Sequence, residues 1–154
     1  MMIHASIPAD DPERVARVIA ELWRGRSAPL PFAPGAYVAI AGDDRGTQIE
    51  VGRRGREAVP GKTQVGFRDN PLPSPYSEVH LNILCPLSES EIVAIAEREG
   101  WTALACDRGG FFKLIEFWLE NKFMIELMSE REWMRYRKIA NMVDAAAAGT
   151  YRPE

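Results

Sequence analysis

The side chains best suited to chemistry in this 154-residue chain are its two histidines and the glutamates that follow them at equal distances. Glu50 comes 46 residues after His4, and Glu126 comes 46 residues after His80. Imidazole nitrogens and carboxylate oxygens are ordinary ligands of divalent transition metals. The spacing therefore predicts one module used twice, in which each copy provides one imidazole and one carboxylate to a four-ligand metal site.

Other residues obey the shift of 76 positions that relates the two pairs. Each histidine follows an aliphatic β-branched residue, and residues 49–51 (Ile-Glu-Val) correspond to residues 125–127 (Ile-Glu-Leu). Residues 18–21 (Val-Ile-Ala-Glu) fall on residues 94–97 (Ala-Ile-Ala-Glu), where a helix is expected in both halves. Because three separate segments agree on one offset, the pattern indicates an internal duplication.

The elements expected to position these side chains occur in the same order in both halves. In the first half we expect a strand over residues 2–7, a helix that starts at Asp11-Pro12 and stops at Gly25, an irregular proline-rich stretch over 27–35, and strands at 37–41 and 47–52. In the second half we expect a strand over residues 78–84, a helix opened by a Ser88–Glu91 capping box and ended by Gly100, and strands near 102–106, 112–119 and 123–128. A final helix follows Ser129.

Strand alternation places all four candidate ligands on faces opposite an aliphatic face. The residues expected beside them on the same faces include Ser6, Gln48, Asn82, Met124 and Met128. Such a mixed face makes a poor core and suits a cavity with a bound ligand. Two carboxylates in a partly dry concavity would repel each other without a cation, so we expect a divalent metal. The ligand set does not choose among Zn, Ni, Fe, Co and Mn.

Candidate substrate-binding residues come from the same faces and from a basic run. Gln48, Asn82 and Met128 are expected beside the ligands, and the guanidinium of Arg53 is suited to a substrate carboxylate or phosphate. A solvated loop is the alternative interpretation of the arginines at positions 53, 54 and 56. Glu50 and Glu126 are also the candidate catalytic groups, since a ligand carboxylate that loosens from a metal can move a proton.

Composition restricts the function classes. The net charge of −3 gives no broad basic surface for nucleic acid, and no apolar run approaches the roughly 20 residues that span a membrane. The N-terminus lacks a signal-peptide pattern, and the two cysteines lack a metal-type spacing, so we expect reduced thiols and a cytoplasmic protein. We predict a single domain with a first module over 1–56, a linker over 57–77, a second module over 78–128 and a C-terminal helix over 129–148.

The repeated pattern resembles the vicinal oxygen chelate superfamily, which includes glyoxalase I, extradiol dioxygenases and fosfomycin-resistance proteins. The resemblance covers residues 2–128 and implies an α+β fold, in which paired βαβββ modules form a cup-shaped sheet around one divalent metal ion. It carries the ligand roles to His4, Glu50, His80 and Glu126, on the first and last strand of each module. This ligand set is most like that of glyoxalase I.

The chain departs from the family pattern in three ways. Leu119-Glu120-Asn121-Lys122 replaces the Asp-Pro-Asp-Gly-like turn of many relatives, the proline-rich stretch takes the place of one strand in the first module, and no distinctive glutathione-binding signature is present. The resemblance therefore implies the fold and the metal site more directly than the reaction.

Three functions follow as hypotheses from the resemblance. We favour a metal-dependent glyoxalase-type enzyme that chelates adjacent oxygens of a small carbonyl or hydroxy-acid-like substrate for isomerase, lyase or epimerase chemistry. The alternatives are a non-haem Fe(II) extradiol-type dioxygenase using His4, His80 and Glu126, and a non-catalytic small-molecule binding or resistance protein. Members of the superfamily often form the cup between two subunits, and the aromatic residues of the C-terminal helix offer a contact surface. We therefore also expect a homodimer.

Overall fold

The computed structural model describes residues 4–147, and its first half is a βαβββ module. This module consists of β1 (His4–Ala9), α1 (Pro12–Leu22), β2 (Arg26–Pro29), β3 (Tyr37–Ile40) and β4 (Gln48–Arg53). Its sheet has the strand order β1-β4-β3-β2, with β1 parallel to β4 and the other pairs antiparallel.

The second half repeats this module. It consists of β7 (Leu81–Leu84), α2 (Glu89–Glu99), β8 (Thr102–Asp107), β9 (Lys113–Leu119) and β10 (Phe123–Met128). The strand order β7-β10-β9-β8 and the single parallel pair, β7 with β10, reproduce the topology of the first module. The predicted α+β class with paired βαβββ modules is therefore confirmed.

The pairing register of the parallel strands follows the shift of 76. In the first module Ser6 lies opposite Glu50, and in the second Asn82 lies opposite Glu126. A shift of one residue in either strand would turn its side chains to the other face of the sheet. The shared register therefore keeps both glutamates on equivalent faces.

Each sheet buries its aliphatic face against its own helix. Asp11 caps α1 by accepting a hydrogen bond from the backbone N of Arg14 (3.0 Å), and Pro12 occupies the first turn, where its missing N–H costs nothing. Ser88 and Glu91 form the predicted capping box of α2, and Gly100 ends that helix with a φ of 69°. The buried core combines residues of both modules.

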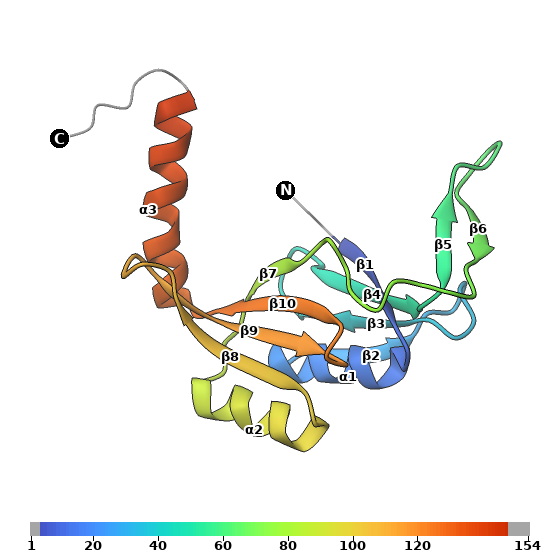
Figure 1. Cartoon of the computed structure of the whole chain (residues 1–154), viewed down its shortest axis with the longest axis horizontal. Helices are drawn as coiled ribbons and strands as arrows, with labels where there is room; N and C mark the ends of the chain where they lie inside the picture. The colour runs from blue at the N-terminus through green and yellow to red at the C-terminus, as the bar shows by residue number, and fades with distance from the viewer. Residues whose placement is uncertain (1–3, 148–154) are drawn as a thin grey trace.

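Two arms extend from the sheets on the side away from α1 and α2 (Figure 1). One is α3 (Glu130–Ala147), and the other is the hairpin of β5 (Arg56–Val59) and β6 (Gly66–Asp69). Aromatic contacts hold the base of α3, where Tyr136 packs edge-on against Phe112 (5.3 Å between centroids) and stacks with Trp133. Within residues 4–147 no helix is long and apolar enough to cross a membrane.

The structure corrects three expectations about individual segments. The stretch over 27–35 was expected to be irregular, but Arg26–Pro29 is a strand, because β2 lies at the sheet edge where Pro29 need not donate to a neighbour. The strand expected over 78–84 begins only at Leu81, since the Ser77 hydroxyl accepts a hydrogen bond from Val79 N (3.1 Å) and holds a turn. The range 57–77, expected to be a linker between the modules, contains most of the β5–β6 hairpin.

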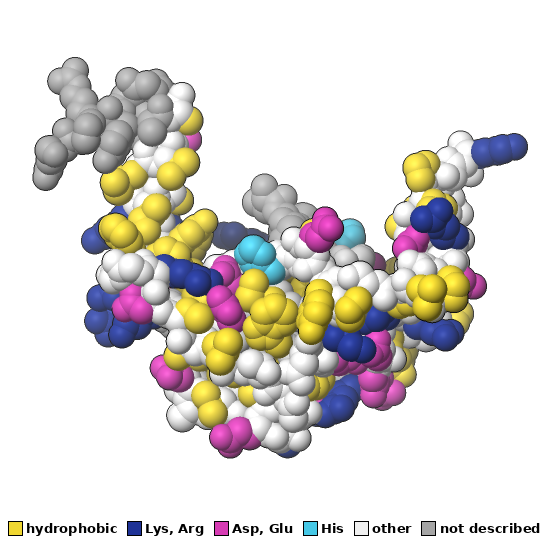
Figure 2. Space-filling model, in the orientation of Figure 1, with side chains coloured by type: hydrophobic (Ala, Val, Ile, Leu, Met, Phe, Trp, Pro, Cys, Tyr) yellow, Lys and Arg dark blue, Asp and Glu magenta, His cyan; other side chains and the backbone are white. Residues whose placement is uncertain are grey.

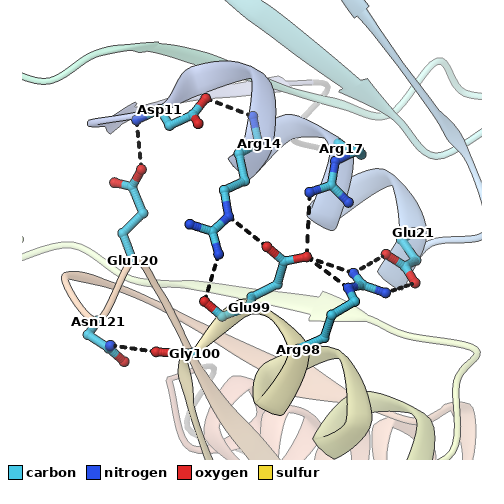
Figure 3. A network of polar contacts seen from close by, with 9 residues as sticks. All are labelled: Asp11, Arg14, Arg17, Glu21, Arg98, Glu99, Gly100, Glu120 and Asn121. Atoms are coloured by element: carbon cyan, nitrogen blue, oxygen red, sulfur yellow. Dashed lines mark hydrogen bonds and ion pairs between the residues drawn. The ribbon is translucent and has the colours of Figure 1, made fainter.

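A polar network joins the two modules through their helices (Figure 3). Glu99 at the end of α2 accepts hydrogen bonds from Arg14 Nε (2.6 Å) and Arg17 Nη2 (3.4 Å) of α1. Arg98 bonds Glu21 of α1 with two nitrogens, at 2.9 and 2.6 Å. The modules are therefore tied together on the helix side of their sheets.

Candidate functional site

His4 and Glu50 form what we call the first half-site, on the face of its sheet that α1 does not cover. Along β1 and β4, burial alternates, so that Ile7, Ile49 and Val51 are buried against the helix. His4 is exposed and Glu50 is half-buried on the other face. The Ser6 hydroxyl donates to Glu50 Oε2 (3.0 Å), and Glu50 Oε1 accepts no hydrogen bond from the described residues.

His80 and Glu126 form the second half-site: Glu126 lies on the equivalent face of the second sheet, and His80 directly precedes β7, outside the strand in which it was expected. His80 Nε2 lies 3.9 Å from Glu126 Oε2, and the side-chain amide of Asn82 donates to that same oxygen (3.0 Å). Asn82 corresponds to Ser6 under the shift of 76. Both modules therefore hold their glutamate through a polar side chain two residues after the histidine.

Arg108, which sequence reasoning did not single out, completes the polar contacts of the second half-site. Its Nη2 donates to Glu116 Oε1 (2.8 Å) and to Glu126 Oε1 (3.0 Å). The hydrogen bond to Glu116 and, as the next largest effect, the hydrogen bond to Glu126 raise the pKa of Arg108 above its ordinary value. The guanidinium therefore stays charged. The charge of Arg108 thus compensates two carboxylates that face each other across β9 and β10.

The two half-sites do not meet within one chain. Among residues 4–147, no three His, Cys, Asp or Glu side chains lie close enough together to hold a metal ion. Each half-site has donors of the right chemistry, an imidazole and a carboxylate, but two donors do not make a divalent metal site. The residues fit a metal only where a first half-site meets a second half-site.

The remaining residues predicted to bind substrate are Gln48, Arg53 and Met128. Gln48 is half-buried and lies opposite His4 in the β1–β4 ladder, beside the first half-site. Arg53 is exposed at the end of β4. Met128 is buried (1% exposed) and lines a separate cavity of about 370 Å³ between the starts of α2 and α3 and the β8–β9 hairpin.

The neighbours of Arg53 in the basic run have structural contacts. Arg54 is nearly buried and donates to Asp10 (2.8 Å), and the Arg56 guanidinium lies 4.7 Å from the ring centroid of Phe67. Hydrogen bonds from Lys122 and Arg54 lower the pKa of Asp10 despite the opposing effect of burial. Two of the three arginines therefore support the fold around the β5–β6 hairpin.

The face that carries the half-sites is also rich in exposed apolar side chains. In Figure 2 the histidines (cyan) lie on the surface between the two arms, with apolar side chains (yellow) along α3 and on the opposite arm. Large exposed hydrophobic residues of the two arms and of the segment before β7 include Val65, Phe67, Leu72, Tyr76, Val79, Met134, Met142 and Val143.

The comparisons with known proteins agree with this architecture. No protein-family model matches the sequence, and no curated protein matches it. Among solved structures, a glyoxalase family protein from Bacillus anthracis matches with a TM-score of 0.55 and 15% identity over 84% of this chain and 93% of that one. Fosfomycin resistance protein FosX from Mesorhizobium loti matches with 0.50 and 14% over 82% and 89%.

The trypanothione-dependent glyoxalase I of Leishmania major covers more of the chain. It matches with a TM-score of 0.50 and 19% identity over 97% of this chain and 98% of that one. At these identities the matches show the fold alone, and they span both modules. The chain therefore has the same fold as these glyoxalase and fosfomycin-resistance structures.

Proposed function

We propose that two copies of this chain form a glyoxalase-type, divalent-metal-dependent enzyme with each metal site shared between the copies. His4 and Glu50 of one copy would meet His80 and Glu126 of the other. The observation that carries the proposal is the pair of half-sites. Each offers one imidazole and one carboxylate on an uncovered sheet face, and the two do not converge within one chain.

The occupant of this face is proposed to be a second copy because only a second copy supplies the missing half-site. A twofold symmetric pair would place the first half-site of each copy against the second half-site of the other, giving two equivalent sites. The exposed apolar residues of the arms flank the same face, and their burial would favour association.

The side chains of the half-sites divide the chemistry between them. A bound metal ion would supply Lewis acidity toward adjacent oxygens of a small carbonyl or hydroxy-acid-like substrate. Ser6 and Asn82 orient the two carboxylates by donating to one oxygen of each. Glu50 Oε1 accepts no hydrogen bond in the described chain, whereas Glu126 Oε1 accepts one from Arg108, so Glu50 is the better placed of the two to take a proton from the carbon alpha to a carbonyl.

A mixing experiment tests the shared site. One variant carries His4→Ala with Glu50→Gln, and the other carries His80→Ala with Glu126→Gln. Neither has an intact site alone, but a mixed dimer has one site with all four ligands and one with none. Random pairing of equal amounts therefore restores Mn²⁺ binding to about a quarter of the wild-type value per chain. If wild type binds Mn²⁺ and the mixture does not, the shared site is wrong.

The reaction is tested separately from the metal. Wild type loaded with Mn²⁺, Zn²⁺ or Ni²⁺ should exchange the alpha proton of small hydroxycarbonyl compounds in D₂O, followed by NMR, and Glu50→Gln should abolish exchange. Oxygen uptake with a catechol by Fe²⁺-loaded Glu50→Gln protein would instead favour the dioxygenase. Ligand binding that survives a chelator, without turnover, would favour a binding protein.

A further inference from the structure

Two carboxylates face each other beside the second half-site. Glu116 of β9 and Glu126 of β10 are directly paired in the antiparallel ladder, and their side chains are 19% and 13% exposed. Like charges placed directly opposite each other destabilise a sheet. One nitrogen of Arg108 bridges the two carboxylates, at 2.8 Å from Glu116 and 3.0 Å from Glu126. This bridge removes the repulsion within a single chain.

The first module has no counterpart of this bridge. Val38 lies opposite Glu50 where Glu116 lies opposite Glu126. The β8–β9 hairpin also continues two residue pairs further than the β2–β3 hairpin, through Cys106 and Asp107. Arg108 and Glu116 are therefore a feature of the second module alone and not a remnant of the repeat.

The turn at the end of the β8–β9 hairpin fixes the backbone of Arg108 and leaves its side chain room to move. Arg108 N donates to the carbonyl of Phe112 (2.9 Å), and Gly109 and Gly110 have φ angles of 67° and 79°, which glycine adopts readily. The Arg108 side chain is 39% exposed, against 13% for Glu126. The guanidinium can thus leave Glu126 and stay bonded to Glu116 while both carboxylates keep their positions on the strands.

We infer that Arg108 is a displaceable internal cation, which neutralises Glu126 when no metal is bound and is retained by Glu116 when Glu126 binds a metal. The inference rests on the proposed function. A divalent ion at Glu126 would be repelled by the Arg108 guanidinium, whose nitrogen lies 3.0 Å from one oxygen of that carboxylate. Glu116 already binds the same nitrogen at the shorter distance of 2.8 Å, so the guanidinium keeps one carboxylate partner after it leaves Glu126.

The test measures Mn²⁺ affinity by electron paramagnetic resonance, together with thermal stability without metal. Arg108→Gln should bind Mn²⁺ more tightly, by about tenfold, because the competing charge is gone. The same variant should unfold at a lower temperature in chelator, since Glu116 and Glu126 then repel each other. Opposite changes in affinity and stability are not expected if Arg108 only supports the fold. Arg24→Gln, which removes a surface pair with Glu91 on α2, is the control and should leave Mn²⁺ affinity unchanged.

A second variant tests the role of Glu116. Glu116→Gln should weaken Mn²⁺ binding, because Arg108 then stays on Glu126, and the weakening should be smaller in the Arg108→Gln background if it acts through Arg108. Arg108→Lys keeps the charge and should bind Mn²⁺ less tightly than Arg108→Gln. Where Arg108→Gln fails to fold, the weaker binding expected of Glu116→Gln relative to wild type decides.

The outcomes separate this inference from the proposed function. If wild type binds Mn²⁺ and Arg108→Gln binds it equally or more weakly, Arg108 is not a competing cation, and the metal site stands. If neither protein binds Mn²⁺, Zn²⁺ or Ni²⁺, the proposed function fails and the inference with it. Binding by Arg108→Gln alone would support the inference directly.

Discussion

Replacing Glu99 with glutamine should destabilise the polar contact between α1 and α2 that joins the two modules, which we call the junction. Glu99 is the buried charged residue of the described core, with a side chain only 5% exposed. Its carboxylate accepts hydrogen bonds from Arg14 Nε (2.6 Å), Arg98 Nε (2.9 Å) and Arg17 Nη2 (3.4 Å), as Figure 3 shows. Glu99→Gln keeps the shape, removes the charge and turns an NH₂ group toward arginine donors.

The expected loss of stability depends on how exposed the arginine partners of Glu99 are. The arginine side chains are 40–52% exposed, so solvent screens each pair and the individual contributions are small. The carboxylate itself is buried, and losing a charged acceptor for several donors costs more than a surface pair. We expect a loss of about 2–3 kcal/mol in the free energy of unfolding, which for a chain of this size lowers Tm by about 4–12 °C.

The same carboxylate should contribute to acid sensitivity. Burial acts to raise the pKa of Glu99, but hydrogen bonds from Arg14 and Arg98 outweigh it and hold the pKa below its ordinary 4.5. Because the folded pKa is lower than the unfolded one, the stabilisation is complete above about pH 4.5 and is lost as pH falls through the folded pKa. The difference between wild type and Glu99→Gln should therefore shrink in acid.

Thermal unfolding followed by circular dichroism between pH 3 and pH 8 measures both effects. Glu97→Gln is the matched control, because Glu97 is an exposed glutamate two residues earlier on the same helix. It should shift Tm by no more than about 2 °C, as surface exchanges usually do. If Glu99→Gln behaves like Glu97→Gln at pH 7, the network does not stabilise the junction and the reasoning is refuted.

Three further predictions concern single contacts. Glu120→Ala should cost about 1–3 kcal/mol of unfolding free energy in a urea titration, since the Glu120 carboxylate accepts from two backbone amides just before α1 (2.7 Å each); an unchanged midpoint would contradict this. Asn82→Ala should weaken Mn²⁺ binding about tenfold, because it releases Glu126 Oε2, and wild-type affinity would show that the amide does not orient the ligand. Burial raises the thiol pKa of both Cys85 and Cys106. At pH 7.5 we therefore expect Cys106 to react with Ellman's reagent more slowly than free cysteine does, and buried Cys85 to react only after the protein unfolds. Rapid reaction of two thiols in the native protein would overturn this.

Local patterns were sufficient to predict the modules and the faces of the strands that carry the two glutamates. Strand alternation and the shift of 76 placed Glu50 and Glu126 opposite aliphatic faces, and the ladders have the register that this requires. The departure at Leu119–Lys122 also has a local explanation. Glu120 and Asn121 have φ angles of 52° and 55°, and Lys122 N donates to Leu119 O, as in a type I′ turn, which joins β9 to β10 without glycine.

Contacts between distant segments could not be predicted from the sequence pattern. Arg108 reaches Glu126 from 18 residues away because it follows β8, which lies in the same sheet as β10 with β9 between them, and no periodicity in the sequence marks that contact. The β2 strand was missed because its proline, Pro29, is tolerated only at a sheet edge, and edge position is a property of the whole sheet. How the half-sites lie relative to each other depends on the α1–α2 junction, which involves residues about 80 positions apart.

The junction leads to a last prediction, that metal binding depends on protein concentration. The ion pairs of Figure 3 join the modules through α1 and α2, so the two sheet faces that carry the half-sites point away from this contact between the modules. If a site forms only where two copies meet, metal and dimer stabilise each other by mass action. Dilution should then release Mn²⁺ as the species in sedimentation falls toward the single-chain mass of 17.3 kDa, and saturating Mn²⁺ should shift dissociation to lower protein concentration. A monomer that retains its metal on dilution would place the whole site within one chain.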